Sequence, residues 1–219
     1  DSVQINEAFT ANNVPLFVAY YRRSLPRFNH VKRWLGEGAI GEVRHVCWNL
    51  SKPANQIDVS GALNWRTDAA VAPAGYFDDL ACHGLDLFGY LLGDICEAKG
   101  VTANQQGLYS ADDAVSASWL HESGVTGSGS WNFGCFERED RVEVFGNQGK
   151  LTFSIFDEKP IVLKNRLGEQ TLDIPHPANI QLCHVENMRE HLLGTLQHPS
   201  SGGSAVHTGW VMDQILGKL

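Results

Sequence analysis

Two side chains that can transfer a proton, Asp79 and His83, lie four residues apart in an apolar run that begins at Gly75. In a helix, this spacing places the carboxylate and the imidazole on one face. Asp86 and Tyr90 continue the polar stripe beside an apolar side made of Phe77, Leu80, Gly84, Phe88 and Leu91. Such a stripe suits acid–base chemistry, with Asp79 orienting the ring of His83 and raising its pKa. The spacing alone is equally consistent with a structural role for both residues. In that interpretation Asp79 complements the helix dipole and His83 is a half-buried histidine.

Short segments on both sides of this helix form an ordered pattern. They comprise residues 17–23 with Pro26, 38–43, 64–66, 110–114 and 209–216, and the helix itself spans residues 74–93 with an Asp three positions after His83. In this order they resemble the Gfo/Idh/MocA oxidoreductases, a family of sugar and polyol dehydrogenases. The resemblance covers nearly the whole chain.

The resemblance implies a reaction in which hydride leaves a secondary alcohol for a nicotinamide while a proton leaves the hydroxyl. We therefore expect His83 to be the proton donor or acceptor and Asp79 to be its catalytic partner. In the resembled family these positions work beside the lysine of a Glu-Lys-Pro segment. No such segment precedes this helix in the chain, where the letters Glu-Lys-Pro occur only later, at residues 158–160.

The same resemblance implies binding residues. Asn64, Trp65 and Arg66 match the segment that reaches over the sugar, where amide, indole and guanidinium groups can hold hydroxyls. Tyr21 is a weaker candidate for the substrate pocket, and Arg22 is expected near the nicotinamide as a cofactor-binding residue. In the structural alternative, Trp65 anchors a loop and Arg66 is a surface cation.

Residues 36–41 match the dinucleotide pattern G-x-G-x-x-G letter for letter. That pattern binds pyrophosphate when a strand precedes the glycines and a helix follows them. Here helical spacing precedes the glycines and a strand-like run from Val43 to Trp48 follows them. We therefore interpret the glycines as a helix end and a turn.

Composition excludes several classes of protein. A net charge of −8 without an extended basic cluster argues against a nucleic acid or an anionic membrane as partner. Five cysteines without paired spacing favour reduced thiols in a cytoplasmic protein, and no metal-binding motif is present. No segment approaches about 18 consecutive apolar residues.

The pattern along the chain predicts an α+β fold. It indicates helices at 2–13, 27–37, 180–196 and 205–216, strands at 14–21 and ending near 50, a long loop at 51–74, and antiparallel strands from 97 to 174. The turn signals at 122–124, 146–149 and 165–168 separate these last strands. We expect a large, mainly antiparallel sheet with helices packed on one face, as in the dihydrodipicolinate-reductase-like C-terminal domains of the family. The resemblance implies that the other face associates with a second subunit.

Ahead of the helix that carries Asp79 and His83, the chain has neither the glycine-rich turn after a first strand nor the Glu-Lys-Pro segment of the family's nucleotide-binding domain. We therefore interpret residues 1–219 as a single substrate-binding and oligomerisation domain, the C-terminal fragment of a two-domain oxidoreductase. NAD or NADP is expected to bind mainly to the absent domain, so that this fragment alone is inactive.

We favour a dehydrogenase of a sugar, a polyol or a related secondary alcohol. Two alternatives share the fold: an NAD-dependent glycosidase, and a non-catalytic regulator that responds to dinucleotide. Such glycosidases tend to carry a Gly-Gly-His-Gly signature, which is absent here. Retention of both Asp79 and His83 argues against the regulator.

Overall fold

The computed structural model describes residues 2–62 and 64–218. An eight-stranded sheet forms one layer, in the order β2-β3-β4-β1-β5-β6-β7-β8. Its strands are β1 (Val43–Ser51), β2 (Ile95–Ala103), β3 (Ala114–His121), β4 (Thr126–Asn132), β5 (Glu139–Gly146), β6 (Gly149–Phe153), β7 (Ile161–Asn165) and β8 (Gly168–Leu172). The predicted α+β class is confirmed.

The sheet is antiparallel except where β1 runs parallel to β4. This exception arises because β1 comes early in the chain and inserts between two later hairpins. The predicted turns at 122–124, 146–149 and 165–168 connect β3 to β4, β5 to β6 and β7 to β8. Alternation along β1 points Val46, Trp48 and Leu50 into the core.

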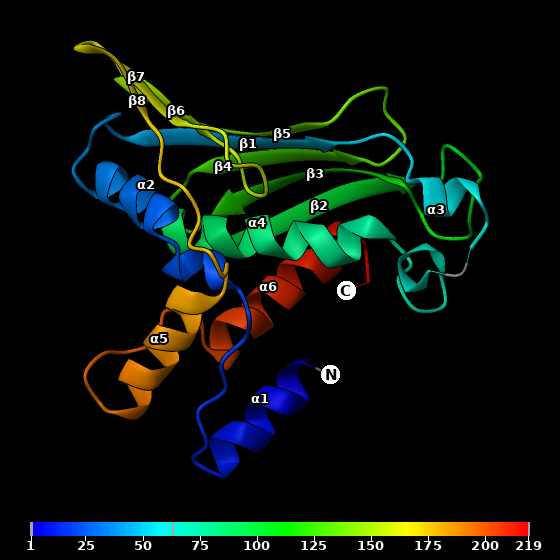
Figure 1. Cartoon of the computed structure of the whole chain (residues 1–219), viewed down its shortest axis with the longest axis horizontal. Helices are drawn as coiled ribbons and strands as arrows, with labels where there is room; N and C mark the ends of the chain where they lie inside the picture. The colour runs from blue at the N-terminus through cyan, green and yellow to red at the C-terminus, as the bar shows by residue number, and fades with distance from the viewer. Residues whose placement is uncertain (1, 63, 219) are drawn as a thin grey trace.

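The helices lie on one side of this sheet (Figure 1). They are α1 (Ser2–Ala11), α2 (Pro26–Gly36), α3 (Gln56–Val59), α4 (Tyr76–Leu92), α5 (Leu182–Leu192) and α6 (Gly202–Ile215), with two 3-10 turns, η1 (Tyr21–Ser24) and η2 (Trp65–Thr67). Helix α4 runs along the sheet, α6 packs against α4 and β2, and α1 packs on α6. None of the helices in the described part of the chain has the length and apolar character of a membrane span.

Helix α4 approaches the sheet closely because Gly84 has no side chain. A Cβ atom at this position would overlap the ring of Trp48 on β1. The Trp48 ring meets Trp131 and Phe88 edge to face, with centroids 5.4 and 6.0 Å apart. Gly93 ends the helix at φ 93°, a conformation that favours glycine.

The strand expected at residues 14–21 is absent, and this prediction was wrong. The segment makes only one bridge, from Phe17 to Ser201, and then turns into η1. Its aromatic residues pack against histidines instead of a neighbouring strand: the Phe17 ring lies 4.8 Å from that of His198. The loop expected at 51–74 is also more ordered than predicted, because it contains α3 and η2.

The second face of the sheet carries small and polar side chains. Cross-strand pairs on this face include Ser116 with Ser130 and Ser118 with Ser128. His45 on β1 bonds Thr126 and Ser128 of the adjacent strand. No helix of the described residues covers this face (Figure 1).

We expect Gly84→Ala to lower the free energy of unfolding by about 1–3 kcal/mol, because the added methyl forces Trp48 or α4 to move. Urea unfolding followed by tryptophan fluorescence measures the change. Gly89→Ala is the matched control, since a Cβ there meets no atom within 4 Å. Alanine in that helix position should leave stability unchanged or raise it by about 0.5–1 kcal/mol. Equal effects at both positions would contradict the close-packing account.

Candidate active site

Asp79 and Arg66 form an ion pair at the start of α4. Arg66 Nε lies 2.7 Å from Asp79 Oδ2, and each side chain is about a third exposed or less. The Arg66 guanidinium also covers the Trp65 ring, with its Cζ atom 4.4 Å from the ring centroid. Arg66 comes from η2, so the loop brings the predicted Trp65–Arg66 segment onto the predicted Asp79.

His83 lies one turn further along α4, in an aromatic surround. Its ring centroid lies 5.8 Å from both Tyr20 and Tyr21 and 6.1 Å from Phe156. Nδ1 of His83 is buried and has no hydrogen-bond partner. Nε2 is therefore the ring nitrogen available to a substrate.

The expectation that Asp79 orients the ring of His83 and gives it a raised pKa does not match the structure, because the net shift of the His83 pKa is downward. Burial, followed by the positive charge of Arg22, lowers the pKa of His83 to about 4. The charge of Asp79 acts in the opposite direction but is the weakest of the three effects, and the carboxylate bonds Arg66 instead of the ring. His83 is thus a neutral imidazole at neutral pH, a state that accepts protons.

Arg22 is 3% exposed and belongs to η1, which begins at the end of the segment 14–21 that was expected to be a strand. Its Nε atom donates to the carbonyl of Ile155 at 3.0 Å. Its Cζ atom lies 4.5 Å from the centroid of Phe156 and 4.8 Å from that of Tyr21. Nη1 is buried without a partner, and burial lowers the pKa of the guanidinium.

Asn64 points into the protein. Its side-chain amide donates to Asp58 at 3.2 Å and to the Tyr76 hydroxyl at 3.0 Å, and its oxygen accepts from the backbone N–H of Arg66. Tyr76 donates in turn to Asp58, which is 5% exposed. Asp58 and Tyr76, which hold Asn64, were not predicted. Asp58 belongs to the four-residue helix α3 and Tyr76 is the first residue of α4, and hydrophobic periodicity gives no signal at either place.

The rest of the polar stripe on α4 is structural. Asp86 is fully buried and accepts two bonds from Arg23, each at 2.8 Å, and a third from Thr208. The hydroxyl of Tyr90 donates to Asn29 on α2. The stripe therefore divides into a half-exposed end at Asp79 and His83 and a buried end that ties α4 to its neighbours.

Tyr20 and Cys82 also border His83, and sequence patterns did not single them out. Burial raises the pKa of the Cys82 thiol to about 12, which excludes a reactive thiolate at neutral pH. Burial likewise raises the pKa of Tyr20. Both residues act as neutral walls of the site.

The glycine pattern of residues 36–41 has the reversed order that the sequence indicated. Helix α2 ends at Gly36 and β1 begins at Val43. Gly38 and Gly41 both adopt φ 71°, as glycines in turns do. Since a strand and not a helix follows the glycines, no helix N-terminus is placed there to bind a pyrophosphate.

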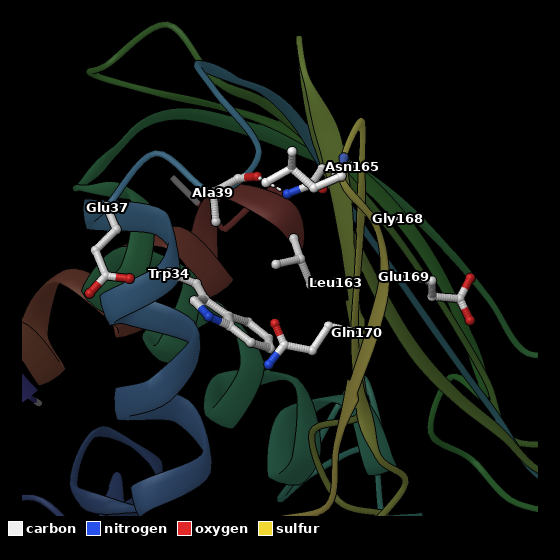
Figure 2. Close-up of a pocket in the computed structure, with 9 residues that line it drawn as sticks. Trp34, Glu37, Ala39, Leu163, Asn165, Gly168, Glu169 and Gln170 are labelled. Carbon is white, nitrogen blue, oxygen red and sulfur yellow. Dashed lines mark hydrogen bonds between the residues drawn. The ribbon is translucent and has the colours of Figure 1, made fainter.

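A separate cavity of about 380 Å³ lies between α2 and the β7–β8 hairpin. Figure 2 shows Trp34, Leu163 and Gln170 side by side between the helix and the hairpin, whereas the side chains of Glu37 and Glu169 point away from them. None of the residues around His83 lines it. Among the described residues, no group of three or more His, Cys, Asp or Glu side chains is placed to hold a metal ion.

The fold and this helix-borne site define an α+β domain in which one sheet face supports a candidate acid–base centre. Residues 28–152 match the family model described as the GFO/IDH/MocA C-terminal domain. This match covers more than half of the chain. The protein therefore belongs to the Gfo/Idh/MocA family.

Individual relatives agree with this assignment. Oxidoreductase P35 of Formosa agariphila is 30% identical over 212 residues, which are 96% of this chain and 65% of that protein. Levoglucosan dehydrogenase of Pseudarthrobacter phenanthrenivorans is 25% identical over 130 residues, 59% of this chain and 30% of that protein. A levoglucosan dehydrogenase solved with NADH and levoglucosan superposes with a TM-score of 0.84 at 19% identity, covering 99% of this chain and 67% of that one. The likeness to that structure shows the shared fold, and the chain spans about two thirds of the length of Oxidoreductase P35.

Because the pKa of His83 is lower in the folded protein than its usual value of about 6.5, the unfolded chain takes up the proton first as the pH falls. The neutral, buried ring of His83 therefore makes its full contribution to the free energy of unfolding above pH 6.5. This contribution is lost progressively as the pH falls toward 4. We expect His83 to contribute a loss of about 2 kcal/mol of unfolding free energy between pH 7 and pH 4.5. Urea unfolding of the wild type and of His83→Gln at both pH values measures this contribution as a difference. An identical pH dependence in the two proteins would contradict it.

Proposed function

We propose that this chain is the substrate-binding and catalytic domain of an NAD(P)-dependent oxidoreductase that acts on a sugar, a polyol or a related secondary alcohol. The observation that carries the proposal is the half-buried, neutral imidazole of His83 beside the Arg66–Asp79 ion pair. The relative named levoglucosan dehydrogenase supports the substrate class. In this proposal, residues 1–219 form a single domain, and a nucleotide-binding domain outside them holds most of the cofactor.

The chain's own residues fit a nicotinamide near η1. Arg22 Nη1 and His83 Nδ1 are both buried without hydrogen-bond partners, and the charge of Arg22 acts on the His83 ring. Arg22 and Tyr21 are the residues that would border the nicotinamide ring. When bound, NAD(P)⁺ supplies the hydride acceptor of the reaction.

His83 performs the proton transfer. Its Nε2 lone pair takes the hydroxyl proton of the alcohol as the C–H bond gives up its hydride, and the same nitrogen returns the proton when a carbonyl is reduced. The low pKa keeps the ring unprotonated, so that the base is ready throughout the neutral range. Tyr20, Tyr21 and Phe156 restrict access of water to the ring.

Arg66 and Trp65 bind the substrate in this proposal. The guanidinium has donors left over after its Nε bond to Asp79, and it stands on the indole, which is half exposed. A polar group above an aromatic face suits the alternating hydroxyl and C–H surfaces of a sugar. Asp79 acts by fixing Arg66, and Asn64 acts by fixing the backbone of the same segment.

The proposal extends to assembly and location. The uncovered sheet face, with its serine pairs, is the surface through which we infer that a second copy associates. The five cysteines are free thiols, which agrees with a cytoplasmic protein. We infer a small-molecule substrate, with neither a nucleic acid nor a membrane as partner.

The test uses the protein together with the nucleotide-binding domain that the proposal requires. Absorbance of the reduced cofactor, followed with NAD⁺ and with NADP⁺ across aldoses, polyols and anhydrosugars, should identify an alcohol that is oxidised. His83→Ala should lower kcat by a factor of about 10² to 10⁴ and leave the dissociation constant of the cofactor nearly unchanged.

Near-normal turnover of His83→Ala on that alcohol would contradict the assigned proton transfer. Cofactor binding without net oxidation of any alcohol would favour the regulator, and cleavage of glycosides without net cofactor reduction would favour the glycosidase.

Asp79→Asn should raise the substrate KM by about fivefold and change kcat less, because the amide holds Arg66 without a charge. Steady-state kinetics at saturating cofactor separate the two constants. Asp78→Asn is the control, since Asp78 bonds the backbone of Ala74 at the helix start and does not touch Arg66. A collapse of kcat at constant KM would place Asp79 in the chemical step instead.

A further inference from the structure

Asp140 on β5 is a completely buried carboxylate that the proposed reaction does not use. Along this alternating strand it occupies the core face, in line with Val142 and Val144. Its oxygens accept four hydrogen bonds, from Trp48 Nε1 at 3.1 Å and from the backbone N–H groups of Ile155, Phe156 and Asp157 at 3.2, 2.6 and 3.0 Å. Four convergent donors satisfy a buried carboxylate that would otherwise be costly to desolvate.

One peptide group connects this carboxylate to Arg22. The N–H of Phe156 donates to Asp140, and the carbonyl of Ile155, on the other side of the same peptide bond, accepts from Arg22 Nε at 3.0 Å. The peptide dipole is thus aligned between a buried negative group and a buried positive one. Such a bridge compensates both charges without direct contact between them.

The same turn also carries one wall of the site. Phe156 places its ring 4.5 Å from Arg22 Cζ and 6.1 Å from the His83 ring. The turn is closed by a bond from the Ser154 hydroxyl to the carbonyl of Asp157. The position of this turn therefore fixes the positions of two groups near His83, the Arg22 guanidinium and the Phe156 ring.

Asp140 also reaches the helix that carries His83 by a second route. The indole N–H of Trp48 donates to Asp140, and the face of that indole is the surface against which Gly84 packs. The Trp48 ring also lies 6.2 Å from that of Phe156. One carboxylate is therefore bonded to both supports of the site, the turn and the indole under α4.

We propose that Asp140 is a positioning residue of this site, which acts through the 154–157 turn on the surroundings of His83. The catalytic part of this inference rests on the proposed function. Asp140 touches neither substrate nor reacting atoms. Its role is to hold the turn in the one arrangement that keeps Arg22 beside His83.

The experiment compares Asp140→Asn with Asp157→Asn. Both variants remove one carboxylate charge at the same turn, but the Asp157 side chain points outward to Arg138 and Lys159. Asparagine at 140 has one oxygen in place of two, so it presents an NH₂ group to N–H donors and releases part of the turn. Asp157→Asn keeps every bond to Asp140.

The first readout is the NMR titration of the His83 ring in the 219-residue chain, which needs neither cofactor nor substrate. In the wild type we expect a midpoint near 4, because burial lowers the pKa of His83. Asp140→Asn should raise it toward about 6.5, because water reaches the ring when the turn loosens. Asp157→Asn should leave it near 4. An unchanged His83 titration in folded Asp140→Asn would overturn the proposal.

The second readout is kinetic, in the protein with its nucleotide-binding domain. Asp140→Asn should lower kcat by about 10- to 100-fold with the cofactor KM changed less than about threefold. Equal kinetic losses in both variants would overturn the proposal. If the wild type oxidises no alcohol, the proposed function fails, and the NMR titration still decides the role of Asp140.

A milder variant covers the case in which Asp140→Asn does not fold. Ser154→Ala removes the bond that closes the turn but leaves the carboxylate and its four donors in place. The His83 titration should then rise by a smaller amount in the same direction. No rise in folded Ser154→Ala, together with loss of folding in Asp140→Asn, would reduce Asp140 to a stability role.

Discussion

The contact between Gly84 of α4 and the indole of Trp48 is the constraint on which the rest of the structure depends. It lets the helix backbone lie against the sheet, where a side chain would hold it away. The residue next to Gly84 is His83, so this close approach also brings the imidazole down to the level of the 154–157 turn. A helix held further from the sheet would expose His83 to water and restore an ordinary pKa.

Three arginines near this helix each compensate the charge of a different carboxylate. Arg23 compensates the buried Asp86 in direct contact, Arg66 pairs with the half-exposed Asp79, and Arg22 reaches Asp140 only through a peptide group. The direct buried pair fixes α4 to η1, since breaking it would leave a charge unpaired in the core. The half-exposed pair contributes little stability and is free to serve a ligand. The bridged pair leaves Arg22 with an unsatisfied nitrogen beside His83.

Local patterns predicted the elements but not the partners of their side chains. The helix from Tyr76 to Leu92 followed from its 3.6-residue period and from Gly93, and the antiparallel strands followed from alternation and turn residues. The segment 14–21 was mistaken for a strand because aromatic and β-branched residues suit both a strand and an irregular segment packed on histidines.

The candidate site itself required contacts between distant residues. Asp79 was paired with His83 because they are near in sequence, whereas the fold brings Arg66 to the carboxylate from a loop that has no period. The sequence does carry one signal for the support of this site, because Asp140 shares the core face of an alternating strand with Val142 and Val144. A carboxylate in that register indicates a buried polar anchor.

The role of His83 as the group that exchanges a proton with the substrate can be tested by a structure of the protein with its nucleotide-binding domain, a nicotinamide cofactor and an alcohol substrate. We expect the reacting hydroxyl oxygen to lie within about 2.6–3.2 Å of His83 Nε2. We also expect a second hydroxyl of the substrate to bind the Arg66 guanidinium, with Asp79 still bonded to Arg66. A substrate oxygen bound instead by Asp79, with His83 covered and out of reach, would contradict the account.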